Sequence, residues 1–255
     1  MANYHLEVQV ISRGQGRSVT KLANYITGRK LHDSYYDKTY YRKRDDVLYS
    51  RVFQPDNAPP DFYDLQYLCN KIDEAEIRYD AQTAREFKGS LPNELPFHEL
   101  TRIVGEFTRT NFVNHDLCAI AAIHEGRNAN DLSRNNPHVH IIVPIRTVGP
   151  DGFSRKKDRE HNKSEYLIMW RKDWADVQNR AYERSGLDIR VSHESLEVQG
   201  IDRKPTPHLS LADWQREKRG EHTDAGDKKR EIEARNRERA LKRDKKRERV
   251  WERSR

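Results

Sequence analysis

The feature that most constrains the fold is a pair of apolar runs separated by a polar segment. The runs cover residues 117–123 and 139–143, and the intervening residues 125–135 are rich in Gly, Asn, Asp and Arg. Short apolar runs bounded by turn-forming residues are typical of buried strands, and two of them joined in this way predict a β-hairpin. The two runs therefore predict two adjoining strands.

Three histidines lie on these predicted strands. His124 follows the first run, whereas His138 and His140 stand at the start of the second. Because alternate residues of a strand face the same side, His138 and His140 project from one face. Burying imidazoles without partners is costly. The sequence therefore predicts a metal site formed by the three histidines, and the alternative is a structural cluster.

Three protein ligands leave coordination positions open on a metal ion, as in catalytic metal sites. The chain has no GxxxxGK[ST] motif, and Gly14 and Gly16 alone are too weak an indication of a dinucleotide site. Residues 35–51 contain five tyrosines and five basic residues, which suits base stacking and phosphate binding. The alternative is an exposed hairpin whose tyrosines pair across strands. An open metal ion beside such a segment favours phosphodiester chemistry.

Charge is distributed unevenly along the chain. Residues 228–255 contain 14 Lys or Arg and 6 Asp or Glu, a net charge of +8, whereas the other residues contain 34 and 35, a net charge of −1. A nucleic-acid surface outside the tail therefore requires local segregation of charge. We expect one domain over residues 1–206 and a charged, uninterrupted helix over residues 207–255. This extension could track DNA, bind a partner or act as a solvated linker.

The two cysteines, Cys69 and Cys118, lie in apolar surroundings and far from any CxxC motif, so we expect buried, reduced thiols. No apolar segment is long enough to span a membrane, and the N-terminus begins with a strand pattern rather than the apolar core of a signal peptide. These features predict a cytoplasmic protein without membrane insertion.

The remaining hydrophobic pattern predicts strands separated by helices. Alternation over residues 4–11 predicts a strand, and Ser18 and Gly28 bracket a helix with Tyr25 at the margin of its apolar face. The other expected elements are helices over residues 61–86, 96–111 and 170–186, a basic loop over residues 153–159 and a strand over residues 187–191. This order predicts an α+β fold in which helices pack on an antiparallel sheet.

The chain as a whole resembles the MobA/MobL family of plasmid relaxases, a branch of the HUH endonucleases, over roughly residues 4–236. Residues 11–31 are similar to the nucleophile motif of the family, and Tyr25 falls on its catalytic tyrosine. The metal motif is matched by Ala122-Ile123-His124 and Asn136-Pro137-His138-Val139-His140. Residues 68–95 are similar to the middle motif, whose acidic residue near the metal falls on Glu86.

The resemblance implies a ferredoxin-related palm that nicks and rejoins one DNA strand at an origin of transfer. Tyr25 would attack the scissile phosphate, leaving a 5′-phosphotyrosyl link and a free 3′-hydroxyl, while a divalent ion on the three histidines would stabilise the developing charge. Mg or Mn is the expected working ion, although Zn, Ni or Co would also suit histidine ligands. Glu86 would be a direct ligand, an outer partner of a histidine or a charge on a helix surface.

The resemblance also implies a bacterial protein whose partners are single-stranded and origin-of-transfer DNA, accessory relaxosome proteins and a coupling protein. Basic and aromatic side chains are candidate DNA contacts. These candidates are Arg13, Arg17, Tyr40, Tyr41, Arg42, Lys43, Arg44, Arg155, Lys156 and Lys157. The chain departs from the family pattern at Lys21, Asn24, Cys69, Asp73 and Glu194, which affects packing and DNA contact rather than the chemistry.

Two other functions fit parts of the sequence. A rolling-circle replication initiator or single-tyrosine transposase of the HUH class would place its tyrosine on a helix after the histidines, where Tyr166 and Tyr182 lie. A non-catalytic DNA-binding module with a structural zinc would instead bind DNA without a covalent adduct and would lose its fold on chelation.

Overall fold

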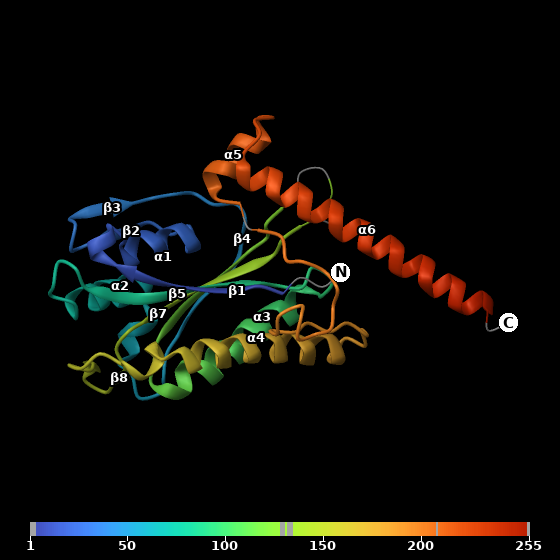
Figure 1. Ribbon diagram of the computed structural model, residues 1–255. Helices are drawn as coiled ribbons and strands as arrows, with labels where there is room; N and C mark the ends of the chain where they lie inside the picture. The colour runs from blue at the N-terminus through green and yellow to red at the C-terminus, as the bar shows by residue number, and fades with distance from the viewer. Residues whose placement is uncertain (1–3, 128–130, 132–134, 208, 254–255) are drawn as a thin grey trace. The chain divides into compact units, whose positions relative to one another are not determined.

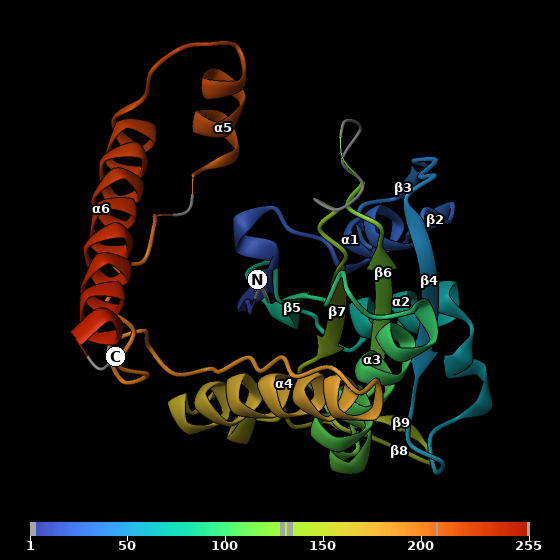
Figure 2. The same cartoon turned by 90° about the vertical axis from the view of Figure 1, so that its right-hand side faces the viewer.

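The computed structural model describes residues 4–127, 131, 135–207 and 209–253. The chain divides into two compact units, residues 1–193 and residues 194–255. The first unit contains a five-stranded antiparallel sheet with helices on both faces (Figures 1 and 2). The strand order is β1-β5-β7-β6-β4. The predicted α+β architecture is therefore confirmed.

The predicted hairpin forms the centre of the sheet. Strands β6 (Ala119–His124) and β7 (His138–Pro144) pair with His124 opposite His138, and nearly all of their residues are buried. The other strands of this sheet are β1 (Leu6–Ser12), β4 (Val47–Phe53) and β5 (Gln82–Ser90). Two short hairpins are formed by β2 (Leu31–Asp33) with β3 (Lys38–Tyr40) and by β8 (Val148–Gly149) with β9 (Gly152–Phe153).

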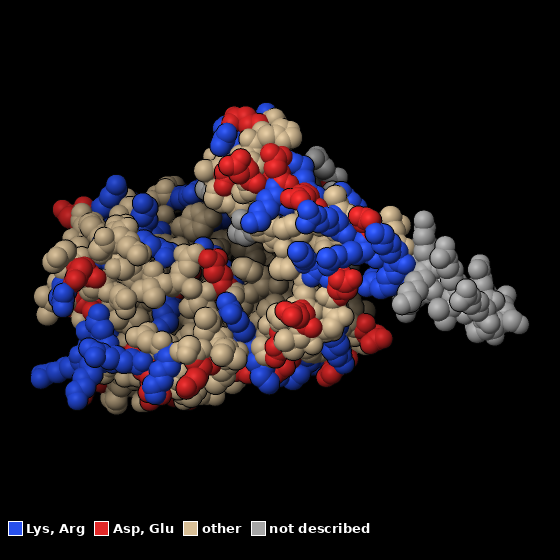
Figure 3. Space-filling model, in the orientation of Figure 1, with Lys and Arg blue, Asp and Glu red and all other residues tan. Residues whose placement is uncertain are grey.

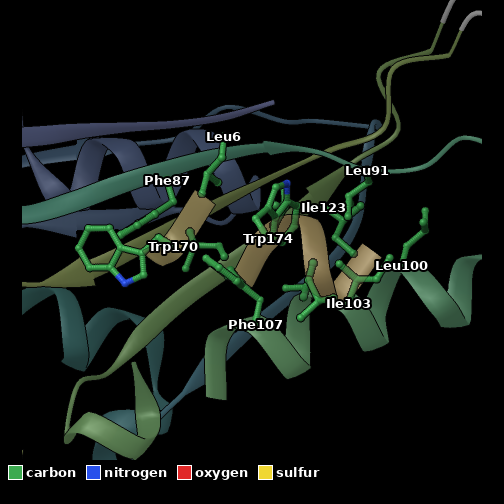
Figure 4. Close-up of a cluster of buried hydrophobic side chains, with 14 of the residues drawn as sticks. Leu6, Phe87, Leu91, Leu100, Ile103, Phe107, Ile123, Trp170 and Trp174 are labelled. Atoms are coloured by element: carbon green, nitrogen blue, oxygen red, sulfur yellow. The ribbon is translucent and has the colours of Figure 1, made fainter. Parts of the chain in front are cut away.

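Helices α3 (Phe97–Asn111) and α4 (Ser164–Arg184) cover one face of the sheet, and α1 (Val19–Thr27) and α2 (Leu65–Glu74) cover the other (Figure 1). On the α3 and α4 side, Phe107 and Trp174 pack edge to face with ring centroids 4.9 Å apart (Figure 4). The even-numbered residues of β6 and β7 face the α1 and α2 side. This alternation directs all three histidines toward α1.

Helix α1 has the predicted bounds because both of its ends are capped. The Ser18 side chain accepts a hydrogen bond from the Lys21 backbone N–H at 3.0 Å. At the other end, Gly28 adopts a φ of 68° and donates its N–H to the Asn24 carbonyl at 2.9 Å, a conformation that favours glycine. Tyr25 lies in the last turn of this helix. The two caps therefore set the position of Tyr25 along the helix end.

Two predictions within the first unit are wrong. Helix α2 ends at Glu74, so the expected helix over residues 61–86 is replaced in its second half by β5. Arg85 and Glu86 are buried and hydrogen-bonded on β5, which hides the strand in the sequence pattern. Residues 187–191 are not a strand, because Val191 exchanges two backbone hydrogen bonds with the Asn179 side chain instead. The five-stranded sheet is completed at its edge by β4 instead.

The second unit contains α5 (Leu211–Lys218) and α6 (Asp224–Arg253) in place of one uninterrupted helix. Glu217 accepts hydrogen bonds from the backbone and hydroxyl of Thr223 and pairs with Arg230, which closes the turn between the helices. Basic side chains line much of α6 (Figure 3). Among the described residues, no helix is both long and apolar enough to cross a membrane.

Candidate metal centre and nucleophile

The three predicted histidines meet at one end of the central hairpin. His124 is the last residue of β6 and lies directly opposite His138, whereas His140 lies opposite Ala122. The ring centroid of His124 is 5.2 Å from that of His138 and 4.9 Å from that of His140. Each ring offers one nitrogen to a common centre, and these nitrogens lie within 4.8 Å of one another.

Each imidazole is oriented by a hydrogen bond on its other nitrogen. Nε2 of His124 lies 2.8 Å from the Ile26 carbonyl, Nδ1 of His138 lies 2.8 Å from the Asn136 carbonyl, and Nδ1 of His140 lies 3.0 Å from Glu86 Oε1. Because these oxygens accept, the bonded nitrogens donate, and in the neutral ring the other nitrogen keeps its lone pair. A second partner of this kind is typical of metal-binding histidines.

The buried Nδ1 of His124 has no hydrogen-bond partner in the described part of the chain. An unpaired buried acceptor is costly, and a divalent cation bound by the three histidines would satisfy it. Burial, together with repulsion from His140, lowers the pKa of His124 to about 4, and burial also lowers the pKa of His138. Both rings are therefore neutral at pH 7, the form that binds metal ions. The donor set fits a metal ion.

Glu86 lies on β5 and is 2% exposed, so the possibility of a charge on a helix surface is excluded. Its Oε1 accepts from His140 and its Oε2 accepts from Arg17 Nη2 at 2.6 Å. Burial opposes ionisation of Glu86, but the hydrogen bond from His140 and the positive charge of Lys88 outweigh it and lower the pKa of the carboxyl. Glu86 is an anion placed behind His140.

Tyr25 stands beside this cluster in the last turn of α1. Its ring centroid is 6.3 Å from that of His124 and 6.1 Å from that of His140. The side chain is partly buried against the α1 and α2 core, at the margin of the apolar face of the helix, as predicted. The next residue of α1, Ile26, supplies the carbonyl that orients His124. One helix end therefore positions both the tyrosine and a histidine.

Two arginines surround the Tyr25 ring. The Cζ atoms of Arg44 and Arg42 lie 4.5 Å and 5.2 Å from the ring centroid. Arg44 also donates to the Tyr25 backbone carbonyl at 3.2 Å and forms a paired salt bridge with Asp46. The hydrogen bond to Asp46 raises the pKa of Arg44, and the same contact lowers the pKa of the Asp46 carboxyl. Asp46 follows Arg44 by two residues, a spacing that suits such a pair, but no motif in the sequence singles it out.

The candidate DNA contacts divide into three groups. Tyr40, Tyr41, Arg42, Lys43 and Arg44 lie in and after β3, where the two arginines reach Tyr25. Within the β2–β3 hairpin, Tyr40 pairs with Leu31 and not with another tyrosine. The second group is Arg13 and Arg17, of which Arg17 is partly buried and bound to Glu86. In the first group, Tyr41, Arg42 and Lys43 are exposed, whereas Tyr40 and Arg44 are half-buried.

The prediction for Arg13 is wrong. Its side chain is 1% exposed and its guanidinium forms an ion pair with Asp73 at 2.9 Å, so it stabilises the end of α2 and cannot reach DNA.

The third group is Arg155, Lys156 and Lys157, which follow β9. Lys157 Nζ pairs with Glu76 Oε2 at 2.8 Å and donates to the carbonyl of Gln82, the first residue of β5. In the sheet, His140 of β7 lies opposite Lys88, which is near the other end of β5. Figure 3 shows basic side chains at the left of the molecule, where Figure 1 draws the chain around β8. This basic segment is therefore separate from the histidines.

The tyrosines expected for a replication initiator do not approach the histidines. Tyr166 and Tyr182 both belong to α4, on the opposite face of the sheet. Tyr182 is fully buried, and Tyr166 packs against His161 with ring centroids 4.4 Å apart. Tyr25 therefore remains as the tyrosine whose ring contacts the cluster.

The fold and the histidine cluster together define a domain of the mobilisation relaxase type. The chain belongs to the MobA/MobL family, whose model matches residues 17–219. It is 29% identical to the "Probable mobilization protein MobA" of Bifidobacterium longum over 83% of this chain and 44% of that relative. It is also 29% identical to "Mobilization protein A" of Escherichia coli over 89% of this chain and 32% of that relative. The chain thus spans less than half the length of each relative.

A solved structure described as "Molecular Basis of Vancomycin Resistance Transfer in Staphylococcus aureus" is similar in fold, with a TM-score of 0.68 and 28% identity. The similarity covers 76% of this chain and all of that chain.

Proposed function

We propose that this domain nicks and rejoins one DNA strand, in a site-specific and metal-dependent reaction, at the origin of transfer of a plasmid or mobile element. The observation that carries the proposal is the approach of the Tyr25 ring to within 6.1 Å and 6.3 Å of two histidine rings whose ligand nitrogens converge. Family membership supports the same assignment.

In the forward step, the Tyr25 phenolic oxygen attacks the scissile phosphorus. The new bond joins phosphorus to the tyrosine oxygen, the bond to the 3′ oxygen breaks, and that oxygen takes up a proton while the phenol loses one. The 5′-phosphotyrosyl link keeps the energy of the phosphodiester. A returning 3′-hydroxyl therefore reverses the step and reseals the strand without a nucleotide cofactor.

His124, His138 and His140 would hold the divalent cation, with Mg or Mn proposed as the working ion. When bound, the cation supplies positive charge that stabilises the phosphoryl oxygens in the transition state. Glu86 acts through His140: it fixes the ring so that Nε2 points toward the common centre, as outer partners of metal-binding histidines do. Glu86 is thus a positioning residue and not a catalytic one.

Arg42 and Arg44 supply further positive charge beside the Tyr25 ring. Arg44 is held by Asp46 and by the Tyr25 backbone carbonyl, so its guanidinium is preorganised. Arg42 is exposed, and its fork-shaped donor set suits the scissile phosphate. Single-stranded and origin DNA are therefore the proposed substrates, with relaxosome proteins and a coupling protein as proposed partners.

The test is formation of a covalent adduct. Purified protein with Mn²⁺ is incubated with end-labelled single-stranded oligonucleotides that tile the DNA adjacent to the gene, and the products are separated under denaturing conditions. We expect a labelled protein band with the wild type and with Tyr182→Phe, and none with Tyr25→Phe. An adduct that survives in Tyr25→Phe and disappears in Tyr182→Phe would contradict the assignment.

A further inference from the structure

A groove of about 510 Å³ lies between the edge strand β4 and helix α3, away from the histidines. Figure 2 shows these two elements next to each other. The odd-numbered residues of β4 that line it face the α3 side of the sheet, whereas the histidines face α1. Its volume falls within the roughly 300–1,000 Å³ typical of small-molecule sites. The lining residues that matter for binding are Tyr49, Arg51, Phe53, Phe97, Glu106 and Arg109.

The groove is positively charged. Within the described residues, Arg51 and Arg109 have no ion-pair partner, and their Cζ atoms lie 5.1 Å and 5.6 Å from the ring centroid of Phe53. Glu106 is the one acidic side chain among the described residues that line the groove, and it is already paired with Arg102 at 2.9 Å and with Arg184 at 3.4 Å. Two guanidinium groups thus remain available for an anionic ligand.

An aromatic side chain stands at the same groove. Phe97, the first residue of α3, is 47% exposed although it is large and apolar. An exposed aromatic ring next to unpaired cations is the combination that binds single-stranded nucleic acid, because every base has a face that can stack and every nucleotide carries a phosphate.

Arg51, on the edge strand β4, belongs to the lining of cavities on both sides of the sheet. Arg51 also lines a smaller cavity of about 90 Å³ on the α1 side, together with Thr27, Arg29 and Ser50. Thr27 follows Ile26, whose carbonyl orients His124. Basic side chains therefore continue from the end of α1, over the edge strand, to Arg109 on α3.

We propose that this groove is a second binding site for single-stranded DNA, which holds the part of the strand flanking the cleaved phosphate. Arg51 and Arg109 bind phosphates, and a base stacks on Phe97. The strand leaves the tyrosine past Arg29 and crosses the edge of β4. The choice of DNA as the ligand rests on the proposed nicking function, but the site is distinct from the residues that carry out the chemistry.

The test measures binding of fluorescein-labelled dT30 by fluorescence anisotropy at several NaCl concentrations. Each phosphate contact contributes about 0.7 to the slope of log K against log salt for single strands. The double variant Arg51→Gln/Arg109→Gln should therefore bind more weakly, with a slope smaller by about 1.4. Phe97→Ala should lose about tenfold in affinity at constant slope.

Arg190→Gln, which removes one exposed positive charge paired with Glu183 outside the groove, is the control for loss of charge and should bind as the wild type does. Melting curves establish that each variant is folded. An unchanged affinity and slope in the folded double variant would overturn the proposal. Binding of poly-L-glutamate, an anion without bases, is measured in parallel. A double variant that loses binding to poly-L-glutamate but still binds dT30 as the wild type does would also overturn the proposal. Binding of dT30 requires no cleavage, so this measurement and the adduct assay can fail independently of each other.

Discussion

The most informative perturbation of the metal centre is Glu86→Gln, which keeps the shape of the side chain and removes its charge. The carboxylate accepts from two donors at once, His140 Nδ1 at 3.0 Å and Arg17 Nη2 at 2.6 Å. A glutamine has one accepting oxygen and one donating amide, so one of its two neighbours must face another donor. Either His140 loses its orienting partner or Arg17 turns toward solvent.

The expected magnitude follows from this geometry. Loss of an outer partner of a metal-binding histidine weakens metal affinity by about 10- to 100-fold, which corresponds to about 1.4–2.7 kcal/mol. A hydrogen bond to a charged group contributes about 1.5–3 kcal/mol to stability, a range that overlaps the loss of metal-binding free energy expected here. Glu86 is 2% exposed, so water cannot easily replace the lost contact. We therefore expect the Kd for Mn²⁺ to rise within that range.

Isothermal titration of metal-free protein with Mn²⁺ at pH 7 measures the effect. Glu183→Gln is the matched control, because Glu183 is exposed and pairs only with a surface arginine in the described structure. Its Kd should equal that of the wild type. A Kd in folded Glu86→Gln within twofold of the wild-type value would refute the role assigned to Glu86.

Three further predictions follow from the same structure. Saturating Mn²⁺ at 100 times its Kd should stabilise the wild type by about 2.7 kcal/mol, and chelation or His138→Ala should abolish this gain in thermal unfolding. Because burial lowers the folded pKa of His124 to about 4, against about 6.5 unfolded, the unfolded chain binds more protons between these values. The metal-free protein should lose about 3 kcal/mol as pH falls from 6.5 to 4, and urea titrations that show no change over this range would contradict it. Gly28→Ala forces a side chain into a φ of 68° and should destabilise α1 by about 1 kcal/mol, with lower adduct yield because Tyr25 and Ile26 precede it. A Gly28→Ala variant as stable and active as the wild type would show that the end of α1 does not control the position of Tyr25.

Part of the site followed from local pattern alone. The two-residue period of a strand places His138 and His140 on one face, and the caps at Ser18 and Gly28 set the bounds of α1. Arg13 and Arg44 are equally basic in sequence, yet one is buried against Asp73 and the other stacks on Tyr25. No local pattern distinguishes them, because burial depends on which elements meet.

By itself, the sequence determined the central hairpin, the capped helix that carries Tyr25 and the convergence of three histidines. It also matched Tyr25 and the histidines to motifs of one family. The tertiary structure decided that Glu86 lies on a strand behind His140, 54 residues away, and that Ile26 orients His124 across 98 residues. Alternation and capping act over a few residues and can be read along the chain. A hydrogen-bond partner far along the chain is chosen only when the sheet brings both groups together.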